Sequence, residues 1–192
     1  MSLGRNSGDG APLRALRSRT VARQKRQTGA VAGMGKSHVL GEPSVRPFRA
    51  SDAQSCCDVV NAAIVEMDGL NEAARRHIVG RNTPEVLGTD LAAWTSIVVE
   101  ADGLGVVAVG ALDGSEIKRV YVDPRAQGLG AGRALLEVLE AEATRSALAE
   151  VRLDASPSSV AFYTSHGYEA HADGGFAIGA AEFSFVTMTK TL

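Results

Sequence analysis

The sequence predicts an α+β domain, and three observations lead to that prediction. Six segments are rich in β-branched or apolar residues over strand lengths, and four others repeat apolar residues at helical spacing. Three of the strand segments follow one another between residues 95 and 122 with no helix between them. Consecutive strands joined by short turns pair antiparallel, so we expect a mainly antiparallel sheet with helices beside it.

The domain is expected to begin with an edge strand near Pro43. Residues 45–49 alternate in polarity, and Pro47 argues against a central strand because proline cannot donate to the ladder. Ser51 and Asp52 then supply an N-cap for an amphipathic helix. The domain therefore opens with a strand, a cap and a helix.

A less regular stretch follows that first helix. Gly69 and Asn71 break the helix, and a second helix is predicted over about 71–80. The structure of residues 81–93 stays open at this stage. One candidate helix start within them is Thr83-Pro84-Glu85, because proline suits the first helical position.

The three consecutive strand segments come next and predict a meander. They cover residues 95–100, 104–112 and 116–122. The middle segment is almost continuously apolar, which is typical of a strand that is buried on both faces. Asp113-Gly114 separates the last two segments and is a strong hairpin signal.

The C-terminal part adds two helices and two strands. We expect a helix over about 132–146, a strand over 150–154, a short helix over 158–165 and a last strand over 183–189. Ser156-Pro157 is typical of an N-cap followed by proline at the first helical position. Gly167 closes the short helix as a glycine directly after His166.

Composition limits the class of protein. The 192 residues are 45% hydrophobic and 22% charged, which is normal for a globular domain with a full core. No apolar run approaches the roughly 18 residues of a transmembrane helix. The cysteines, Cys56 and Cys57, are adjacent, and no Cys/His cluster has zinc-ligand spacing. We therefore predict a cytoplasmic protein with no metal and no membrane association.

The first 42 residues differ from the rest in charge. They hold eight basic and two acidic residues, a net +6, whereas the remainder carries a net −8. Their composition and lack of periodicity predict a basic, disordered extension over 1–42. An inert tail or a misassigned start before Met34 is the favoured interpretation, and a transit peptide or a nucleic-acid-binding arm are the alternatives. No aromatic residue is interleaved with the basic ones, so nucleic acid is not expected as a partner.

Three glycines lie between the strand over 116–122 and the helix after it. Gly128, Gly130 and Gly132 recur every second residue beyond Pro124, which ends the strand. Without Cβ atoms there, the first N–H groups of the helix point outward, and the helix dipole adds partial positive charge. Such a turn suits a phosphate group, and a glycine loop that binds nothing is the alternative. The spacing differs from a G-x-G-x-x-G fingerprint, and no Lys-Ser/Thr pair follows as in a Walker A loop.

The glycine turn carries the first part of a family resemblance. Gln127-x-x-Gly130-x-Gly132, directly after a V-D-P strand end, resembles the Q/R-x-x-G-x-G/A signature of the GNAT superfamily of acyl-CoA-dependent N-acetyltransferases. The resemblance implies that the turn cradles the pyrophosphate of acetyl-CoA, which is a co-substrate, and that no metal takes part.

The second part of the resemblance lies near the C-terminus. The segment S-P-S-S-V-A-F-Y-T-S-H-G-Y resembles the family's N-x-x-A-x-x-[FL]-Y-x-x-x-G-[FY] signature, with Tyr163, Gly167 and Tyr168 in register. Ser156 is a departure, because the family has asparagine there. The resemblance covers about residues 43–192 and implies a GNAT-type mixed, mainly antiparallel sheet of six to seven strands flanked by about four helices.

The resemblance also implies which residues contact acetyl-CoA. In the family, two neighbouring strands splay beside the thioester, and backbone groups of the first strand contact the cofactor, with the N–H of Val122 as the expected oxyanion donor. Ser156 is a weaker contact, since a hydroxyl reaches less far than an amide. The implied cofactor-binding residues are Val120, Tyr121, Val122, Gln127, Gly128, Leu129, Gly130, Ala131, Gly132, Arg133 and Ser156.

Two residues are the candidates for catalysis. A lysine-like amine has a pKa near about 10.4, so it is protonated at pH 7 and needs a base before it attacks a thioester. Glu116, eleven residues before Gln127, matches the general base of lysine-acetylating members, although an ordinary charged strand residue is the alternative. Tyr163 matches the tyrosine that protonates the CoA thiolate, and a core aromatic beside Phe162 is its alternative.

The predicted function is therefore direct transfer of an acetyl group from acetyl-CoA to a primary amine in a ternary complex. The acceptor is expected to be a small-molecule or peptide amine. Two alternatives stay open: a non-catalytic acyl-CoA-binding sensor module, and acetylation of an RNA-linked amine guided by the basic tail. In the family the segment after the first helix borders the acceptor groove, and its sequence does not identify the acceptor here. A homodimer also stays open.

Overall fold

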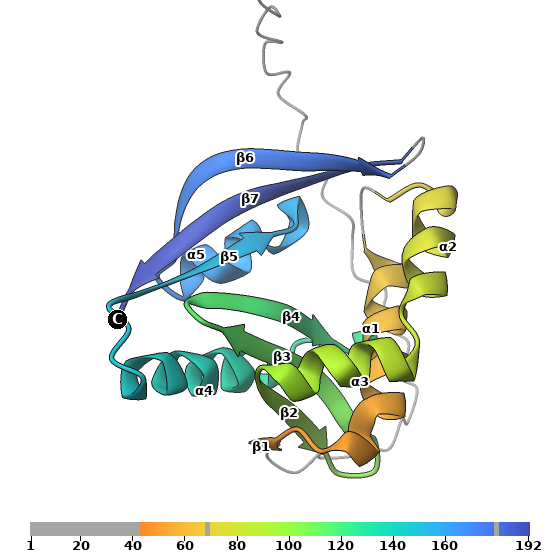
Figure 1. Cartoon of the computed structure of the whole chain (residues 1–192), viewed down its shortest axis with the longest axis horizontal. Helices are drawn as coiled ribbons and strands as arrows, with labels where there is room; N and C mark the ends of the chain where they lie inside the picture. Colours follow the sequence, from red (N-terminus) through yellow and green to blue (C-terminus); the bar gives the residue numbers. More distant parts are fainter. Residues whose placement is uncertain (1–42, 68–69, 179–180) are drawn as a thin grey trace, which may run out of the picture. The chain divides into compact units, whose positions relative to one another are not determined.

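Seven strands form one sheet within the described part of the chain, which is residues 43–67, 70–178 and 181–192 of this computed structural model (Figure 1). In sheet order the strands are β1 (Ser44–Pro47), β2 (Thr95–Ala101), β3 (Gly105–Asp113), β4 (Glu116–Val122), β5 (Glu150–Ala155), β7 (Ala181–Thr191) and β6 (Glu169–Ile178). Only β4 and β5 of these strands pair in parallel. The predicted mixed, mainly antiparallel α+β architecture is confirmed, and the predicted extension over 1–42 lies outside the described residues.

Helices cover both faces of this sheet. The described residues form α1 (Ala53–Glu66), α2 (Glu72–Arg81), α3 (Pro84–Ala93), α4 (Ala131–Arg145) and α5 (Val160–Ser165), with short 3-10 helices at Ala50–Asp52, Pro124–Ala126 and Pro157–Ser159. One core includes Val60 of α1 and Leu91 of α3, and the other includes Leu135 and Leu139 of α4. Strand β3 contributes to both cores and is buried along most of its length, as its apolar run predicted. No helix among the described residues has the length and apolar character to cross a membrane.

Side-chain caps explain where α2 and α3 begin. The Asn71 side chain accepts a hydrogen bond from the N–H of Ala74 at 2.8 Å, which satisfies one of the free donors of the first turn of α2. Thr83 accepts from the N–H of Val86 at 3.3 Å, and Pro84 occupies the first position of α3. The stretch left open by the sequence is therefore a helix, which makes five α-helices in place of about four.

Asp52 stands at the predicted cap position before α1, but its side chain has another role. It makes no cap hydrogen bond to α1. Its oxygens instead accept from the Arg46 guanidinium at 2.7 and 3.0 Å, and that guanidinium also binds Glu100. The N–H of Arg49 donates to the same carboxylate at 2.8 Å. The hydrogen bonds from Arg46 lower the pKa of Asp52, so the buried carboxylate stays ionised. Arg46 of β1 therefore links the start of α1, through Asp52, to Glu100 of β2.

Strand β6 is the element that the sequence did not predict. Its Ala, Gly, Asp and His content gives little β-propensity, and it is a strand because it pairs along its length with β7. Gly174 permits one close approach, since a Cβ atom there would lie 2.4 Å from the Phe185 ring. The hairpin crosses above α5 and reaches α2 at its far end (Figure 1). It therefore contacts the segment that joins α1 to α3.

Candidate functional site

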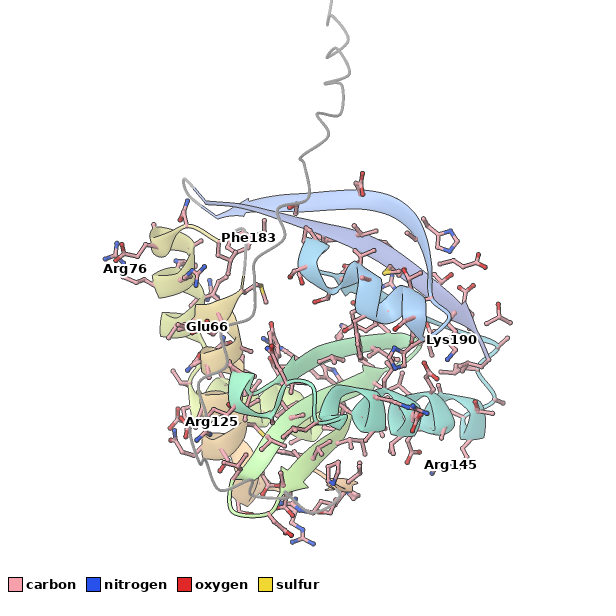
Figure 2. The ribbon with its side chains drawn as sticks, turned by 180° about the vertical axis from the view of Figure 1, so that it is seen from behind. Glu66, Arg76, Arg125, Arg145, Phe183 and Lys190 are labelled. Carbon is pink, nitrogen blue, oxygen red and sulfur yellow. The ribbon has the colours of Figure 1, made fainter. Side chains whose placement is uncertain are left out.

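A pocket of about 630 Å³ opens between the end of α1, the end of β4, the glycine turn and α5. Figure 2 shows α1 with Glu66 on one side of this opening and α5 on the other. Most of the predicted site residues line the pocket: Val120, Tyr121, Val122, Gln127, Gly128, Gly130, Ala131, Gly132, Arg133, Ser156 and Tyr163. The structure thus brings the two motifs of the sequence to one cavity.

The end of β4 is free on one side. Strands β4 and β5 pair only at Glu116 and Arg152, and the described residues give β4 no other partner on that side. A register shift in the β3–β4 ladder and a positive φ of 56° at Arg119 mark a bulge in the middle of β4. Past the bulge, backbone groups of residues 120–122 that face β5 are left without a ladder, so a ligand can pair with them.

A tight turn connects β4 to α4. The buried Asp123 carboxylate accepts from the N–H of Arg125 at 2.8 Å and from its guanidinium at 2.7 Å. These hydrogen bonds lower the pKa of Asp123. Gly128 and Gly130 follow with φ of 78° and 85°, and no heavy atom beyond the adjoining chain lies within 4 Å of where their Cβ atoms would stand. Glycine is needed for this backbone, and the space over it is open.

The start of α4 presents donors to that space. Gly130 is the N-cap residue, and its carbonyl accepts a hydrogen bond from the N–H of Ala134 at 2.9 Å. The first three N–H groups of α4 therefore have no partner within the helix, and the dipole makes this end partially positive. Arg133 adds a guanidinium at the same end, paired with Glu137 at 2.8 Å. Open space, free donors and positive charge fit a pyrophosphate.

Tyr163 is positioned by the way α5 ends. The N–H of Tyr168 donates to the Tyr163 carbonyl at 3.1 Å, and the N–H of Gly167 donates to the Thr164 carbonyl at 3.1 Å. With a φ of 87° at Gly167, this is a Schellman motif, and the predicted closing glycine is confirmed. The motif fixes the last turn of the helix and, with it, the Tyr163 side chain that lines the pocket.

The Tyr163 phenol lies in a mostly apolar environment. The residue is 7% exposed, and the Phe162 and Tyr168 rings pack edge-on at centroid distances of 5.1 and 5.6 Å. Burial, and to a smaller extent the neighbouring Tyr121, raises the pKa of Tyr163 above its ordinary value. Tyr163 therefore carries its proton at neutral pH and is chemically a proton donor.

Ser156 lines the pocket without forming the predicted cap. Its hydroxyl shares hydrogen bonds with Ser159 at 2.7 Å and Ser158 at 3.2 Å, and it makes no cap hydrogen bond to the helix. Proline 157 follows at the first position of the 3-10 helix as expected. The cluster places three serine residues on the lining of the pocket.

Two predicted site residues do not line the pocket. Glu116 lies at the opposite end of β4 from Val122, where β4 still pairs with β5. Its carboxylate is held by Arg152 at 2.9 Å and Lys118 at 3.4 Å. The Leu129 side chain is 44% exposed outside the pocket. Within the described residues, no cluster of three His, Cys, Asp or Glu side chains is arranged to hold a metal.

Three lining residues from the end of α1 were missed by the sequence analysis. They are Ala63, Glu66 and Met67, and Figure 2 shows Glu66 across the opening from α5. Their only signal in the sequence is a carboxylate at the end of a predicted apolar helix, just before the break at Gly69. Nothing in that local pattern shows that the helix end faces the glycine turn, so tertiary structure was required to find them.

Residues 74–192, more than half of the chain, match the family model described as Acetyltransferase (GNAT) domain. A GCN5-related N-acetyltransferase from Rhodopseudomonas palustris is 24% identical with a TM-score of 0.74, covering 80% of this chain and 98% of that one. The yncA structure from Salmonella typhimurium, with its cofactor acetyl-CoA, is 19% identical with a TM-score of 0.63, covering 78% and 94%.

A ribosomal-protein-alanine N-acetyltransferase from Brucella melitensis is 21% identical with a TM-score of 0.59, covering 78% of this chain and 99% of that one. At these identities the three structures show a shared fold. A comparison with proteins of curated function found no match to the chain.

Proposed function

Because the chain belongs to the GNAT family of acetyltransferases, we propose that it moves an acetyl group from acetyl-CoA to a primary amine by direct transfer in a ternary complex. One observation carries the proposal: a single pocket joins the glycine turn before α4 to the Tyr163 side chain on α5. An anion-binding turn and a proton donor on the same cavity are what thioester acyl transfer requires.

Acetyl-CoA binding is assigned to the end of β4, the turn and the start of α4. The N–H groups from Gly128 to Arg133 would hold the pyrophosphate, which the open space and positive helix end support. The unpaired backbone of residues 120–122 would bind the linear arm of the cofactor, with the N–H of Val122 toward the thioester oxygen. Gln127 and Ser156 would add side-chain contacts. The similar yncA structure with acetyl-CoA supports this assignment.

Direct transfer is supported by the state of the two cysteines. Burial raises the pKa of Cys56 to about 12 and also raises that of Cys57, so both thiols are protonated near neutral pH. The Cys57 thiol donates to the Asn82 carbonyl at 2.9 Å in the core beneath α1, and neither cysteine lines the pocket. A covalent acetyl-cysteine step is therefore disfavoured.

Tyr163 is the proposed acid for the leaving group. The C–S bond breaks with its electron pair on sulfur, and the phenol donates a proton to that thiolate. The raised pKa of Tyr163 keeps the proton in place at the pH where the reaction runs. Its place on the pocket wall also argues against a sensor module that binds CoA without turnover.

The proposal specifies the acceptor only as a primary amine. A small-molecule or peptide amine is the proposed acceptor, and the similar structure from Brucella melitensis is named as a ribosomal-protein-alanine N-acetyltransferase. The cytoplasmic location and the homodimer also remain predictions. The alternative of an RNA-linked amine rests on residues 1–42, which lie outside the described residues.

Replacing Tyr163 with phenylalanine tests the proposal. Tyr163→Phe should keep acetyl-CoA affinity and lower kcat by about 100-fold or more, the usual contribution of a general acid. The matched control is Tyr168→Phe, which removes a neighbouring phenol that does not line the pocket and should leave kcat unchanged. The measurements are isothermal titration with acetyl-CoA and release of CoA thiol in the presence of amines. Unchanged turnover in Tyr163→Phe would remove it from the mechanism, and binding with no turnover by the wild type would favour the sensor.

A further inference from the structure

The described wall of the pocket carries formal charge at two places only. Arg133 lies beside the glycine turn, and Glu66 lies at the end of α1. Figure 2 shows Glu66 on α1, across the opening from α5. The cavity therefore has a positive end, which suits the cofactor phosphates, and a negative end, which is available to a ligand of opposite charge.

The Glu66 carboxylate lacks a binding partner in the described part of the chain. It forms no ion pair or hydrogen bond with any described residue, and its side chain is exposed. It is the last residue of α1, where free carbonyl groups and the helix dipole already put partial negative charge. The nearby Arg75 guanidinium donates instead to the Met67 and Leu70 carbonyls, at 2.7 and 3.2 Å. A cation placed at Glu66 would gain from both the carboxylate and the helix end.

The other candidate carboxylate differs in each of these respects. Glu116 lies outside the pocket, and two cations, Arg152 and Lys118, already hold it. Its place at the paired end of β4 and β5 puts it at the opposite end of β4 from Val122, which lines the pocket. The resemblance that made Glu116 a candidate concerned its spacing from Gln127, and the structure supplies a carboxylate on the pocket wall itself.

We propose that Glu66 binds the ammonium group of a cationic acceptor amine and accepts its proton, an inference that rests on the proposed transferase function. The same pocket is lined by Met67, Tyr121 and Tyr163, which offer apolar and aromatic surface to the carbon chain of such an acceptor. The acceptor class is therefore a protonated primary amine on an aliphatic or aromatic chain.

The protons and electrons of this step balance as follows. The ammonium group gives one proton to the Glu66 carboxylate, and the nitrogen lone pair forms the C–N bond to the acetyl carbon. The C–S bond breaks with its electron pair on sulfur, which takes the Tyr163 proton. The second nitrogen proton restores the Tyr163 phenol, and Glu66 releases its proton to solvent.

A comparison of cationic with neutral acceptor amines distinguishes proton acceptance by Glu66 from a purely structural role. The probes are hexylamine, benzylamine and lysine methyl ester, which are cationic at pH 7.5, and aniline and 4-methylaniline, which are neutral. Glu66→Gln should lower kcat/KM for the cationic amines by about 100-fold, change it by less than about threefold for the neutral ones, and leave acetyl-CoA affinity unchanged. Glu66→Asp should recover part of the loss.

The matched control is Glu72→Gln, which removes the same charge from an exposed position on α2 outside the pocket and should change none of these values. Equal losses for cationic and neutral acceptors, or an unchanged kcat/KM for the cationic ones, would overturn the Glu66 assignment while the transferase stands. If the wild type released no CoA with any of these acceptors, the proposed function itself would fall, and the Glu66 role with it.

Discussion

The two ends of the pocket are built in different ways. The cofactor end comes from one continuous run, β4, the glycine turn and the start of α4, and its features are backbone features: unpaired strand groups, positive φ angles and free N–H donors. The proposed acceptor end comes from the end of α1, which is separated from that run by forty-nine residues, and its features are side chains. A backbone site suits a constant ligand, whereas a side-chain site can change its acceptor without changing the fold.

The largest expected effect on the proposed cofactor end comes from adding one Cβ atom to the glycine turn. In Gly130→Ala, the methyl group enters the space assigned to the pyrophosphate, at a φ of 85° that alanine tolerates poorly. We expect acetyl-CoA affinity to fall by about tenfold or more, with a stability loss of about 1–2 kcal/mol from the backbone strain. Isothermal titration and thermal unfolding measure the two effects.

The matched control for that variant is Gly103→Ala. Gly103 has a φ of 76° with equally open surroundings, but it lies in the β2–β3 turn. It should lose similar stability and keep its affinity for acetyl-CoA. Equal weakening of binding by both variants would show that strain, and not the position in the turn, controls affinity.

A smaller effect is expected when one capping side chain is removed at each of the two ends of the pocket. Asp123→Ala frees the N–H of Arg125 and loosens the turn, so acetyl-CoA should bind about threefold to tenfold more weakly. Asn71→Ala removes the cap of α2 and about 1 kcal/mol of stability, and it should raise the acceptor KM without changing acetyl-CoA affinity. Titration with acetyl-CoA and saturation with the acceptor separate the two. The reverse pattern would mean that the two ends are not independent.

The smallest expected effect is a pH profile that does not decline. Burial raises the pKa of Tyr163, so its neutral form, which is the proton donor, persists above the ordinary tyrosine value of 10.0. The kcat measured with a primary amine should therefore not fall between pH 7 and pH 10 through loss of the Tyr163 proton. A basic decline within that range, absent from the residual activity of Tyr163→Phe, would show that Tyr163 loses its proton below pH 10 and would contradict the raised pKa.

The parts that the sequence could predict are those set by local conformation. The turn could be predicted from the sequence because only glycine adopts the positive φ of Gly128 and Gly130 easily. The end of α5 could be predicted from Gly167. Strand β6 could not be predicted from the sequence, because its residues have little β-propensity and it is a strand through its pairing with β7.

The two candidate carboxylates, Glu116 and Glu66, show the same limit of prediction from local sequence. Spacing from Gln127 placed Glu116 on β4, but it could not show the ion pair with Arg152, thirty-six residues away, or that Glu66 would line the pocket instead.

The most direct test of the central claim is isothermal titration of the purified chain with acetyl-CoA and, separately, with desulfo-CoA. The account predicts micromolar binding of both, because the backbone of the turn holds the pyrophosphate that the two ligands share. Absence of binding of either ligand at millimolar concentration would contradict the claim that the glycine turn is a cofactor site.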